Sequence, residues 1–459
     1  MTRSVLARVA EVVRDHVDKL ARSSPARLAL LVFAALIVLV TGLLSLPVAT
    51  TDGIRTTFVD ALFTAVSAVC VTGLTTVDTA THWSPFGHGV IMASIAVGGL
   101  GVMTLASILG LAVSRRIGLT QRLLMSSEKG GTRLGEVGSL VRAIVVASLV
   151  IEGLLALVLV PRFYQAGEGL ASALWHGIFT SVSIFNNAGF VIIDGGLAPY
   201  VGDWWIGLPI IFGTIFGAVG FPVLLEMWRH RARPGRVSLH AKLTLSTFGI
   251  LLVATAIAFA VLEWRNPETL GSLSGSERVL ATLLHATTPR SSGLATLDVS
   301  EFQQSTLLTM DAMMFVGGGS ASTAGGIKVT TFAVLVLGIV AEARGDRDIE
   351  SFGRRIPTES VRLAVAVAFL GTTLVGVATL VLLSTTDFTL DQVVFEVISA
   401  FATCGLSTGI TPHLPDVAKY VLSALMFAGR IGTVTLAAAL ALRSRRRVIR
   451  MPEERPLIG

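Results

Sequence analysis

Composition excludes a soluble globular protein. The 459 residues are 52% hydrophobic and only 14% charged, with a mean hydropathy of +0.75, whereas soluble domains average about 25% charged residues. Apolar runs of about 20 residues are long enough to cross a bilayer. The net charge of +6 does not indicate nucleic-acid binding, because the basic residues are distributed by membrane side. Two cysteines, Cys70 and Cys404, cannot form a disulfide framework and are expected to be buried free thiols.

The lysines and arginines concentrate in alternate polar segments. Loops poor in basic residues separate these segments, and by the positive-inside rule the basic segments face the cytoplasm. We therefore expect both termini to be cytoplasmic. Five such segments hold 28 of the 36 basic residues: 1–27, 114–142, 229–242, 342–362 and 443–459.

The apolar runs predict four units, each made of a span, a short helix and a second span. The expected fold is an all-α integral membrane protein with eight spans and four half-helices. The predicted spans are 28–46, 86–113, 139–160, 203–228, 241–262, a stretch at 304–341, 361–383 and 416–442. The domains follow as a cytoplasmic arm at 1–27, pore repeats at 28–115, 136–230, 238–343 and 358–443, and a cytoplasmic tail at 444–459.

One pattern recurs in all four units and ends at a glycine. These glycines are 116, 104 and 112 residues apart, so the chain is predicted to contain four divergent copies of one unit. The glycines are Gly73, Gly189, Gly293 and Gly405. Six residues earlier stand Ser67, Ser183, Thr287 and Ser399. Five residues later stand Asp78, Asp194 and Asp298, with Ile410 breaking the series.

Four such segments predict a pseudo-four-fold ring around a central pore. Irregular backbone survives at membrane depth only when it is buried or lines a water-filled cavity. The short helices would point their negative C-terminal ends inward, which favours a cation, and the three aspartates would form an acidic outer vestibule. For a single copy, a helix with a glycine C-cap is the simpler interpretation; four copies in register favour the ring. The predicted filter, whose carbonyl oxygens would replace an ion's hydration shell, is Val71, Thr72, Gly73, Asn187, Ala188, Gly189, Ser291, Ser292, Gly293, Thr403, Cys404 and Gly405.

These segments also carry a resemblance to a known family. Residues 68–74, 185–190, 288–293 and 401–409 resemble the selectivity-filter segments of the Trk/Ktr/HKT superfamily of potassium transporters, and the resemblance extends over the chain from about residue 28. With one span before the first short helix, the chain looks most like the KtrB-type membrane subunits of bacterial Ktr systems. In that family a glycine at the position of Gly73 goes with potassium selectivity and a serine with sodium, so the resemblance implies K+ as the transported ion.

The stretch 304–341 is too long for one simple span and contains a glycine-rich interruption at 317–326. Five glycines in ten residues make a continuous helix unfavourable, so two half-helices joined by a loop are predicted. The ending of a nucleotide-binding P-loop is absent. The resemblance implies that this loop is a gate below the filter. The predicted gate residues are Gly317, Gly318, Gly319, Ser320, Ser322, Thr323, Gly325, Gly326, Lys328 and Arg430.

Four charged residues lie within apolar segments. A charge at the position of Arg430 costs at least about 2.5 kcal/mol on insertion scales, so it needs a partner; loop carbonyls would serve, and the resemblance implies a barrier role. Lys328 is either a second gate cation or a helix cap. Glu152 and Asp311 either help to couple Na+ or a proton, or are packing residues; we favour packing for Glu152 and leave Asp311 open.

The residues and the resemblance together predict an ion-conducting subunit for K+ uptake in the bacterial cytoplasmic membrane, and not an enzyme. Regulated uptake, with or without Na+ stimulation, and a partner-independent cation channel stay open as alternatives. A membrane enzyme or non-ion permease would require polar catalytic pairs, which the sequence does not offer. The resemblance implies a homodimer, with one pore in each subunit, and a cytoplasmic ring of nucleotide-binding regulatory subunits of the KtrA/TrkA type.

Overall fold

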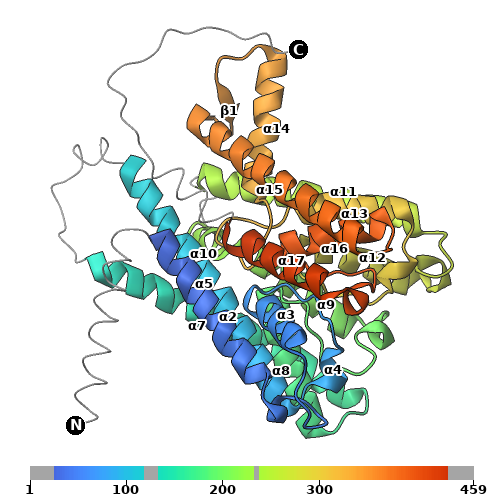
Figure 1. Ribbon diagram of the computed structural model, residues 1–459. Helices are drawn as coiled ribbons and strands as arrows, with labels where there is room; N and C mark the ends of the chain where they lie inside the picture. The colour runs from blue at the N-terminus through green and yellow to red at the C-terminus, as the bar shows by residue number, and fades with distance from the viewer. Residues whose placement is uncertain (1–24, 118–132, 232–236, 433–459) are drawn as a thin grey trace, which may run out of the picture.

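The computed structural model describes residues 25–117, 133–231 and 237–432. The predicted C-terminal tail, nearly all of the N-terminal arm and the last part of the 416–442 span lie outside the described residues. The chain forms long helices that alternate with short ones, packed in one body (Figure 1).

The helices follow the predicted order along the chain, and they are grouped below by the four units that the sequence predicts. The first unit contains α2 (Pro25–Leu44), α3 (Phe58–Val69) and α5 (Pro85–Ile117), and the second contains α7 (Arg133–Gln165), α8 (Leu170–Asn186), α9 (Trp204–Val219) and α10 (Phe221–Arg229). The third contains α11 (Leu239–Glu263), α12 (Gly275–Thr287), α13 (Gln304–Phe315) and α14 (Val329–Arg344). The fourth contains α15 (Thr358–Thr385), α16 (Leu390–Ala402), α17 (Asp416–Phe427) and the π-helical segment η8 (Ala428–Gly432).

Capping side chains explain where three of the short helices begin. Thr57 caps α3 by accepting a hydrogen bond from the backbone N–H of Asp60. Capping boxes start α12 at Ser274 and α16 at Thr389. Such caps satisfy backbone donors that a helix N-terminus leaves free, and therefore define the start of a helix too short to be fixed by its length.

The predicted span at 203–228 is wrong as a single helix. It bends by 94° between α9 and α10, at Gly220, whose φ is +97°. A Cβ at this position would lie 2.7 Å from the carbonyl oxygen of Ser320. The conformation and the close approach both require glycine, so the helix breaks where the chain from residue 316 onward packs against it.

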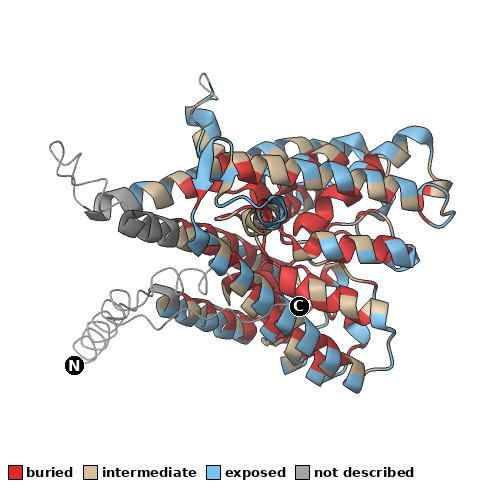
Figure 2. Ribbon diagram, turned by 90° about the horizontal axis from the view of Figure 1, so that it is seen from above, coloured by how far each residue is buried: buried red, intermediate tan, exposed pale blue. Residues whose placement is uncertain are grey.

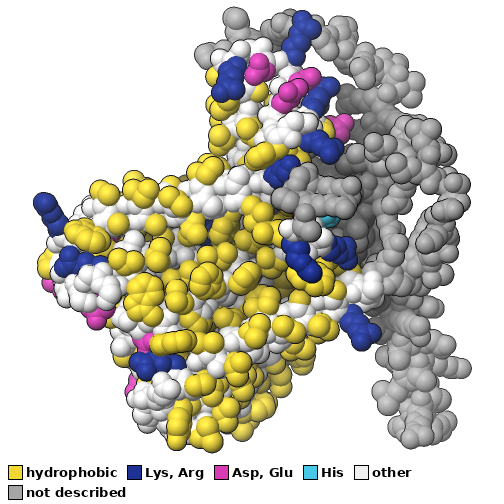
Figure 3. All heavy atoms as spheres, turned by 180° about the vertical axis from the view of Figure 1, so that it is seen from behind, with side chains coloured by type: hydrophobic (Ala, Val, Ile, Leu, Met, Phe, Trp, Pro, Cys, Tyr) yellow, Lys and Arg dark blue, Asp and Glu magenta, His cyan; other side chains and the backbone are white. Residues whose placement is uncertain are grey.

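Long apolar helices surround the molecule. Among the described helices, α2, α5, α7, α11 and α15 are long and apolar enough to cross a membrane, and the bent pair α9 and α10 makes a sixth when it is counted as one span. The surface in Figure 3 is broadly hydrophobic, with charged side chains gathered at its margins. An apolar surface of this extent suits a lipid environment.

The short helices lie inside the set of long apolar helices. Figure 2 shows the buried residues gathered in the interior of the bundle, and the second half of α3 is buried from Phe63 to Val69. An ion pair between Asp60 of α3 and Lys419 of α17, with Nζ and Oδ1 3.0 Å apart, joins the first unit to the last.

A small β-hairpin, absent from our sequence-based expectations, projects beside α14 and α15 (Figure 1). Its strands, β1 (Ile349–Ser351) and β2 (Arg354–Ile356), pair antiparallel. Phe352 and Gly353 form the turn, both with positive φ, as a two-residue hairpin turn of this hand requires.

Candidate functional site

The four predicted glycines meet in a closed cycle, which we call the glycine ring. A Cβ placed on Gly73 would lie 2.5 Å from the carbonyl oxygen of Ala188 and 2.9 Å from the Cα of Gly189. No larger residue fits such an approach without displacing the neighbouring backbone. Each glycine faces the carbonyl that precedes the next one: Gly73 faces Ala188, Gly189 faces Ser292, Gly293 faces Cys404, and Gly405 faces Thr72.

The residue two positions before each ring glycine has a left-handed backbone. A non-glycine residue with positive φ is uncommon, and for a β-branched residue it is a true outlier. All four segments share this turn before the glycine, although in the third the 3-10 helix η5 (Thr288–Arg290) lies between α12 and the turn. The residues and φ values are Val71 (57°), Asn187 (58°), Ser291 (95°) and Thr403 (46°).

Hydroxyl groups within the short helices hold two of the segments. Ser67 Oγ accepts from the backbone N–H of Gly73 at 3.1 Å, and Ser399 Oγ accepts from that of Gly405 at 3.0 Å. Ser183 instead donates to the carbonyl oxygen of Phe190 at 2.8 Å. The two serines satisfy the backbone N–H groups of Gly73 and Gly405, and the carbonyl oxygens before these glycines, those of Thr72 and Cys404, face neighbouring segments.

The interruption expected near residue 317 is confirmed: α13 ends at Phe315 and α14 begins at Val329. The segment Val316–Lys328, which we call the glycine loop, is largely buried. It packs directly against residues of the ring. The side-chain amide of Asn187 is hydrogen-bonded to the hydroxyl of Thr323 at 2.8 Å, and a Cβ on Gly325 would lie 2.8 Å from the carbonyl oxygen of Ala402.

The glycine loop also packs against the break between α9 and α10. The backbone N–H of Gly319 donates to Ala218 at 2.7 Å, and that of Thr323 donates to Gly217 at 3.1 Å. Within the loop, Ser322 donates to the carbonyl of Gly319 at 2.6 Å, and Ser320 lies 3.2 Å from the hydroxyl of Thr330. These bonds fix the loop to the break between α9 and α10 at two backbone positions.

Three basic side chains donate to carbonyl oxygens of the glycine loop. Arg430, 1% exposed, donates through Nη1 to the carbonyl oxygen of Thr323. This is the kind of carbonyl partner that the sequence predicts for it. Lys328 donates through Nζ to Ala324 at 2.5 Å and stands at the N-cap of α14. Arg290 donates through Nη1 to Val316 at 2.7 Å. A buried charge without such partners is expensive, so the loop stabilises the cations as much as they stabilise the loop.

The three predicted vestibule acids are exposed, and two of them are local caps. Asp78 accepts from the backbone N–H of Ala80 at the start of the short helix α4 (Thr79–His82), and Asp298 accepts from that of Ser300. Asp194 is exposed in the corresponding loop. Charge-assisted bonds of this kind fix where a carboxylate lies, so Asp78 and Asp298 have defined positions just after the ring segments.

The two acids with open roles differ in their surroundings. Glu152 accepts from Asn186 Nδ2 at 2.8 Å, which favours the packing interpretation. Asp311, 5% exposed, has one carboxylate oxygen without a partner among the described residues. Both cysteines are free and buried, as expected.

Sequence reasoning missed three buried ionisable residues: Arg290, Glu263 and Glu396, each 0% exposed. Glu263 accepts from Gln303 N–H at 2.9 Å and from the hydroxyl of Thr269 at 2.7 Å, tying α11 to the start of α13. Glu396 accepts from Thr411 at 3.1 Å and supports the segment after Gly405. Their signal was available in the sequence, as charges within otherwise apolar or small-residue runs.

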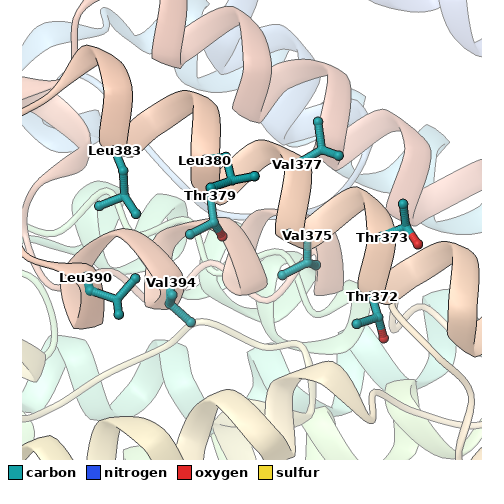
Figure 4. A pocket seen from close by; sticks show the side chains of 10 residues that line it. Thr372, Thr373, Val375, Val377, Thr379, Leu380, Leu383, Leu390 and Val394 are labelled. Atoms are coloured by element: carbon teal, nitrogen blue, oxygen red, sulfur yellow. The ribbon is translucent and has the colours of Figure 1, made fainter.

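A surface groove lined by residues of α15 and α16 is not part of this site. Val375, Leu380, Leu383, Leu390 and Val394 are among its lining residues, and the polar members are threonines (Figure 4). A lining without charged groups on a membrane-spanning helix suits contact with an apolar neighbour and offers little to an ion.

The long apolar helices, the buried ring and the loop beneath it together define a multi-pass helical membrane protein of the transport class. Residues 19–447 match the TrkH family of cation transport proteins. The chain therefore belongs to the TrkH cation transport family. This family consists of transport proteins, which confirms the expectation that the chain is not an enzyme.

Individual relatives are similar over nearly their whole lengths. Ktr system potassium uptake protein B of Bacillus subtilis (strain 168) is 37% identical over 448 residues, covering 97% of this chain and 99% of that protein. Potassium/sodium uptake protein NtpJ of Enterococcus hirae is 34% identical, covering 98% and 100%. The crystal structure of the potassium transporter TrkH from Vibrio parahaemolyticus has the same fold, with a TM-score of 0.71 at 18% identity, covering 88% of this chain and 83% of that one.

Proposed function

We propose that this chain is the ion-conducting subunit of a K+ uptake system of the bacterial cytoplasmic membrane. One observation carries the proposal: the four glycines, spread over more than 300 residues, face one another's carbonyls in a closed cycle. A ring of backbone oxygens at the end of short helices is the means by which a protein replaces the hydration shell of a cation.

The names of the relatives support potassium as the cargo. Ktr system potassium uptake proteins B and D of Bacillus subtilis are 37% and 36% identical to the chain. NtpJ is named for both potassium and sodium, so we infer that Na+ takes part either as a stimulating ion or as a second cargo. Gly73, at the position where the family resemblance associates glycine with K+ and serine with Na+, favours potassium as the main ion.

In this proposal the glycine loop is the gate. Its buried position, its hydrogen bond to Asn187 and its contact with Arg430 support the proposal that this conformation is the closed one. Opening requires the loop to leave Arg430, which then keeps its charge but loses a buried partner. The eight spans, the four pore repeats and the cytoplasmic location of both termini belong to the same proposal.

The test is K+ uptake in cells that lack their own potassium systems, comparing the wild type with Gly73→Ser. A side chain at Gly73 would collide with the neighbouring segment and also has to adopt a φ of +95°. We expect growth on low potassium with the wild type, and a loss of preference for K+ over Na+ of roughly tenfold or more with the variant, equivalent to about 1.4 kcal/mol.

Gly167→Ser is the matched control. Gly167 has a φ of +104°, but a Cβ there meets nothing within 4 Å, so this variant carries similar backbone strain away from the ring. Preserved selectivity in this variant would attribute the Gly73 effect to the ring. A well-expressed wild type that moves neither K+ nor another cation would refute the proposal.

The second candidate is a cation channel that works without a partner. Its support is that the loop is already held by contacts within the chain. Uptake measured with and without a co-expressed nucleotide-binding regulator separates the two: a regulated system changes its rate with the regulator, and a partner-independent channel does not. The homodimer and the regulatory ring implied by the family resemblance are tested in the same cells by co-purification.

A further inference from the structure

Two adjacent residues of the third ring segment contact opposite ends of the glycine loop. Arg290 Nη1 donates to the carbonyl oxygen of Val316, the first residue of the loop, at 2.7 Å. Ser291 Oγ accepts from the backbone N–H of Gly325, near the other end, at 3.1 Å. The segment that contributes Gly293 to the ring therefore holds the loop at two points nine residues apart.

The bond to Val316, at 2.7 Å, is the shortest hydrogen bond of Arg290 among the described residues. The side chain is 0% exposed. Its other partners are more distant: the sulfur and the carbonyl oxygen of Met313 at 3.2 and 3.5 Å, the hydroxyl of Thr255 at 3.4 Å, and the ring of Phe248, whose centroid lies 5.9 Å from Cζ. Within the described residues Arg290 forms no ion pair with an acid. The carbonyls at the C-terminus of α13 form the negative end of that helix, which stabilises a cation. Movement of Val316 would leave the guanidinium poorly partnered.

Ser291 connects three parts of the molecule through one hydroxyl. As a donor it bonds to the carbonyl oxygen of Thr403 in the fourth ring segment at 2.8 Å, and as an acceptor it binds Gly325. The left-handed backbone at this residue, with φ of +95°, places it on the turn that leads into Gly293. A change in the shape of the third segment is thus transmitted to the end of the loop.

We propose that Arg290 and Ser291 form a clasp, a pair of positioning residues that holds both ends of the glycine loop against the ring and so couples the loop to the third ring segment. The proposal deepens the proposed function, because it treats the loop as the gate. The loop leaves its closed position only when the clasp opens, and a shift of the third segment on ion binding loosens the clasp.

The primary test measures loop exposure and does not require transport. Ser322, 0% exposed within the loop, is replaced by cysteine in the full-length chain in lipid nanodiscs, where the native cysteines are buried. Modification by a methanethiosulfonate reagent is then timed. Arg290→Gln and Ser291→Ala should each speed the reaction about tenfold, the effect of losing one buried hydrogen bond, and Arg290→Lys should lie between Arg290→Gln and the parent.

Two controls match the chemistry without touching the loop. Arg278 donates to the backbone carbonyls of Gly271 and Leu273 at 2.7 and 2.8 Å, so Arg278→Gln removes a partly buried arginine that likewise donates to carbonyl oxygens. Ser148 is buried and donates to Ile144 in its own helix, so Ser148→Ala removes an equivalent hydroxyl. Both should leave the modification rate of the cysteine at position 322 unchanged.

Unchanged exposure in Ser291→Ala, which removes a single oxygen and tests the idea even if Arg290→Gln does not fold, would overturn the clasp. The double variant gives a second test. If it speeds the modification by the product of the two single-variant factors, the clasp is also overturned, because two residues that act as one unit do not have independent effects. Cation flux into liposomes distinguishes the two proposals. Faster modification without cation flux in any variant would refute the proposed function but support the clasp. Flux that rises with loop exposure would support both proposals.

Discussion

Residues with left-handed backbone mark the entrance to every ring segment, and two of them, Val71 and Thr403, are β-branched. A β-branched side chain disfavours positive φ, and such conformations cost about 1–3 kcal/mol each. They persist only where the surrounding structure determines them. The shared conformation therefore indicates that ring geometry, and not local preference, sets these four backbones.

We predict that Val71→Gly keeps the protein folded but weakens K+/Na+ discrimination. Glycine relieves the strain at φ of 57° and also lets the first segment sample other shapes, so its carbonyls are held less firmly. Uptake competition between the two ions measures the effect. Phe352→Gly is the comparison, because Phe352 has a similar φ of 50° but lies exposed at the hairpin tip. Equal discrimination in both variants would show that the strained turn is dispensable.

At the scale of elements, the contact of α3 with α17 closes the arrangement between the first unit and the last. Asp60 and Lys419, with side chains 14% and 11% exposed, form the ion pair there. Breaking a mostly buried pair leaves a charge without compensation, which is strongly destabilising.

Asp60→Asn should therefore lower stability by about 3 kcal/mol, the lower end of the range for buried pairs. Thermal unfolding in detergent measures it. Asp348→Asn provides the reference, since the Asp348–Arg355 pair is 2.8 Å long but largely exposed and surface pairs contribute about 0–1 kcal/mol. Similar losses in the two variants would contradict a special role for the α3–α17 contact.

The sequence predicted helices better than it predicted their contacts. Apolar length and the glycine register located the short helices and the break between α13 and α14, because both signals are local. The bend at Gly220 was not predicted, since its cause is the carbonyl of Ser320, 100 residues away. Arg290 stands out in the sequence as a charge among small residues, but its partner could not be predicted, because the carbonyl of Val316 lies 26 residues further along the chain.

At the scale of the whole molecule, the basic segments predict which end faces the cytoplasm. The hairpin around Arg354 lies at the basic end, and the loop containing Glu268 lies at the opposite, base-poor end of the third unit. The positive-inside rule therefore assigns them to opposite sides of the membrane.

Single cysteines at these two exposed positions test the orientation, because the native thiols are buried. A membrane-impermeant maleimide applied to intact cells should label Glu268→Cys but not Arg354→Cys. Arg354→Cys should be labelled only after the cells are permeabilised. Labelling of both from outside, or of Arg354→Cys alone, would invalidate the topology.

Because a single chain supplies all four residues of the glycine ring, each of the four positions has its own codon. In a ring of four identical subunits, one base change alters every position together, and its energetic effect is repeated at each of them. Here one base change alters a quarter of the ring. Ion preference can therefore evolve, or be engineered, in graded steps through functional intermediates. The unlike residues Val71, Asn187, Ser291 and Thr403 at one shared backbone position are the kind of variation that such independent encoding permits.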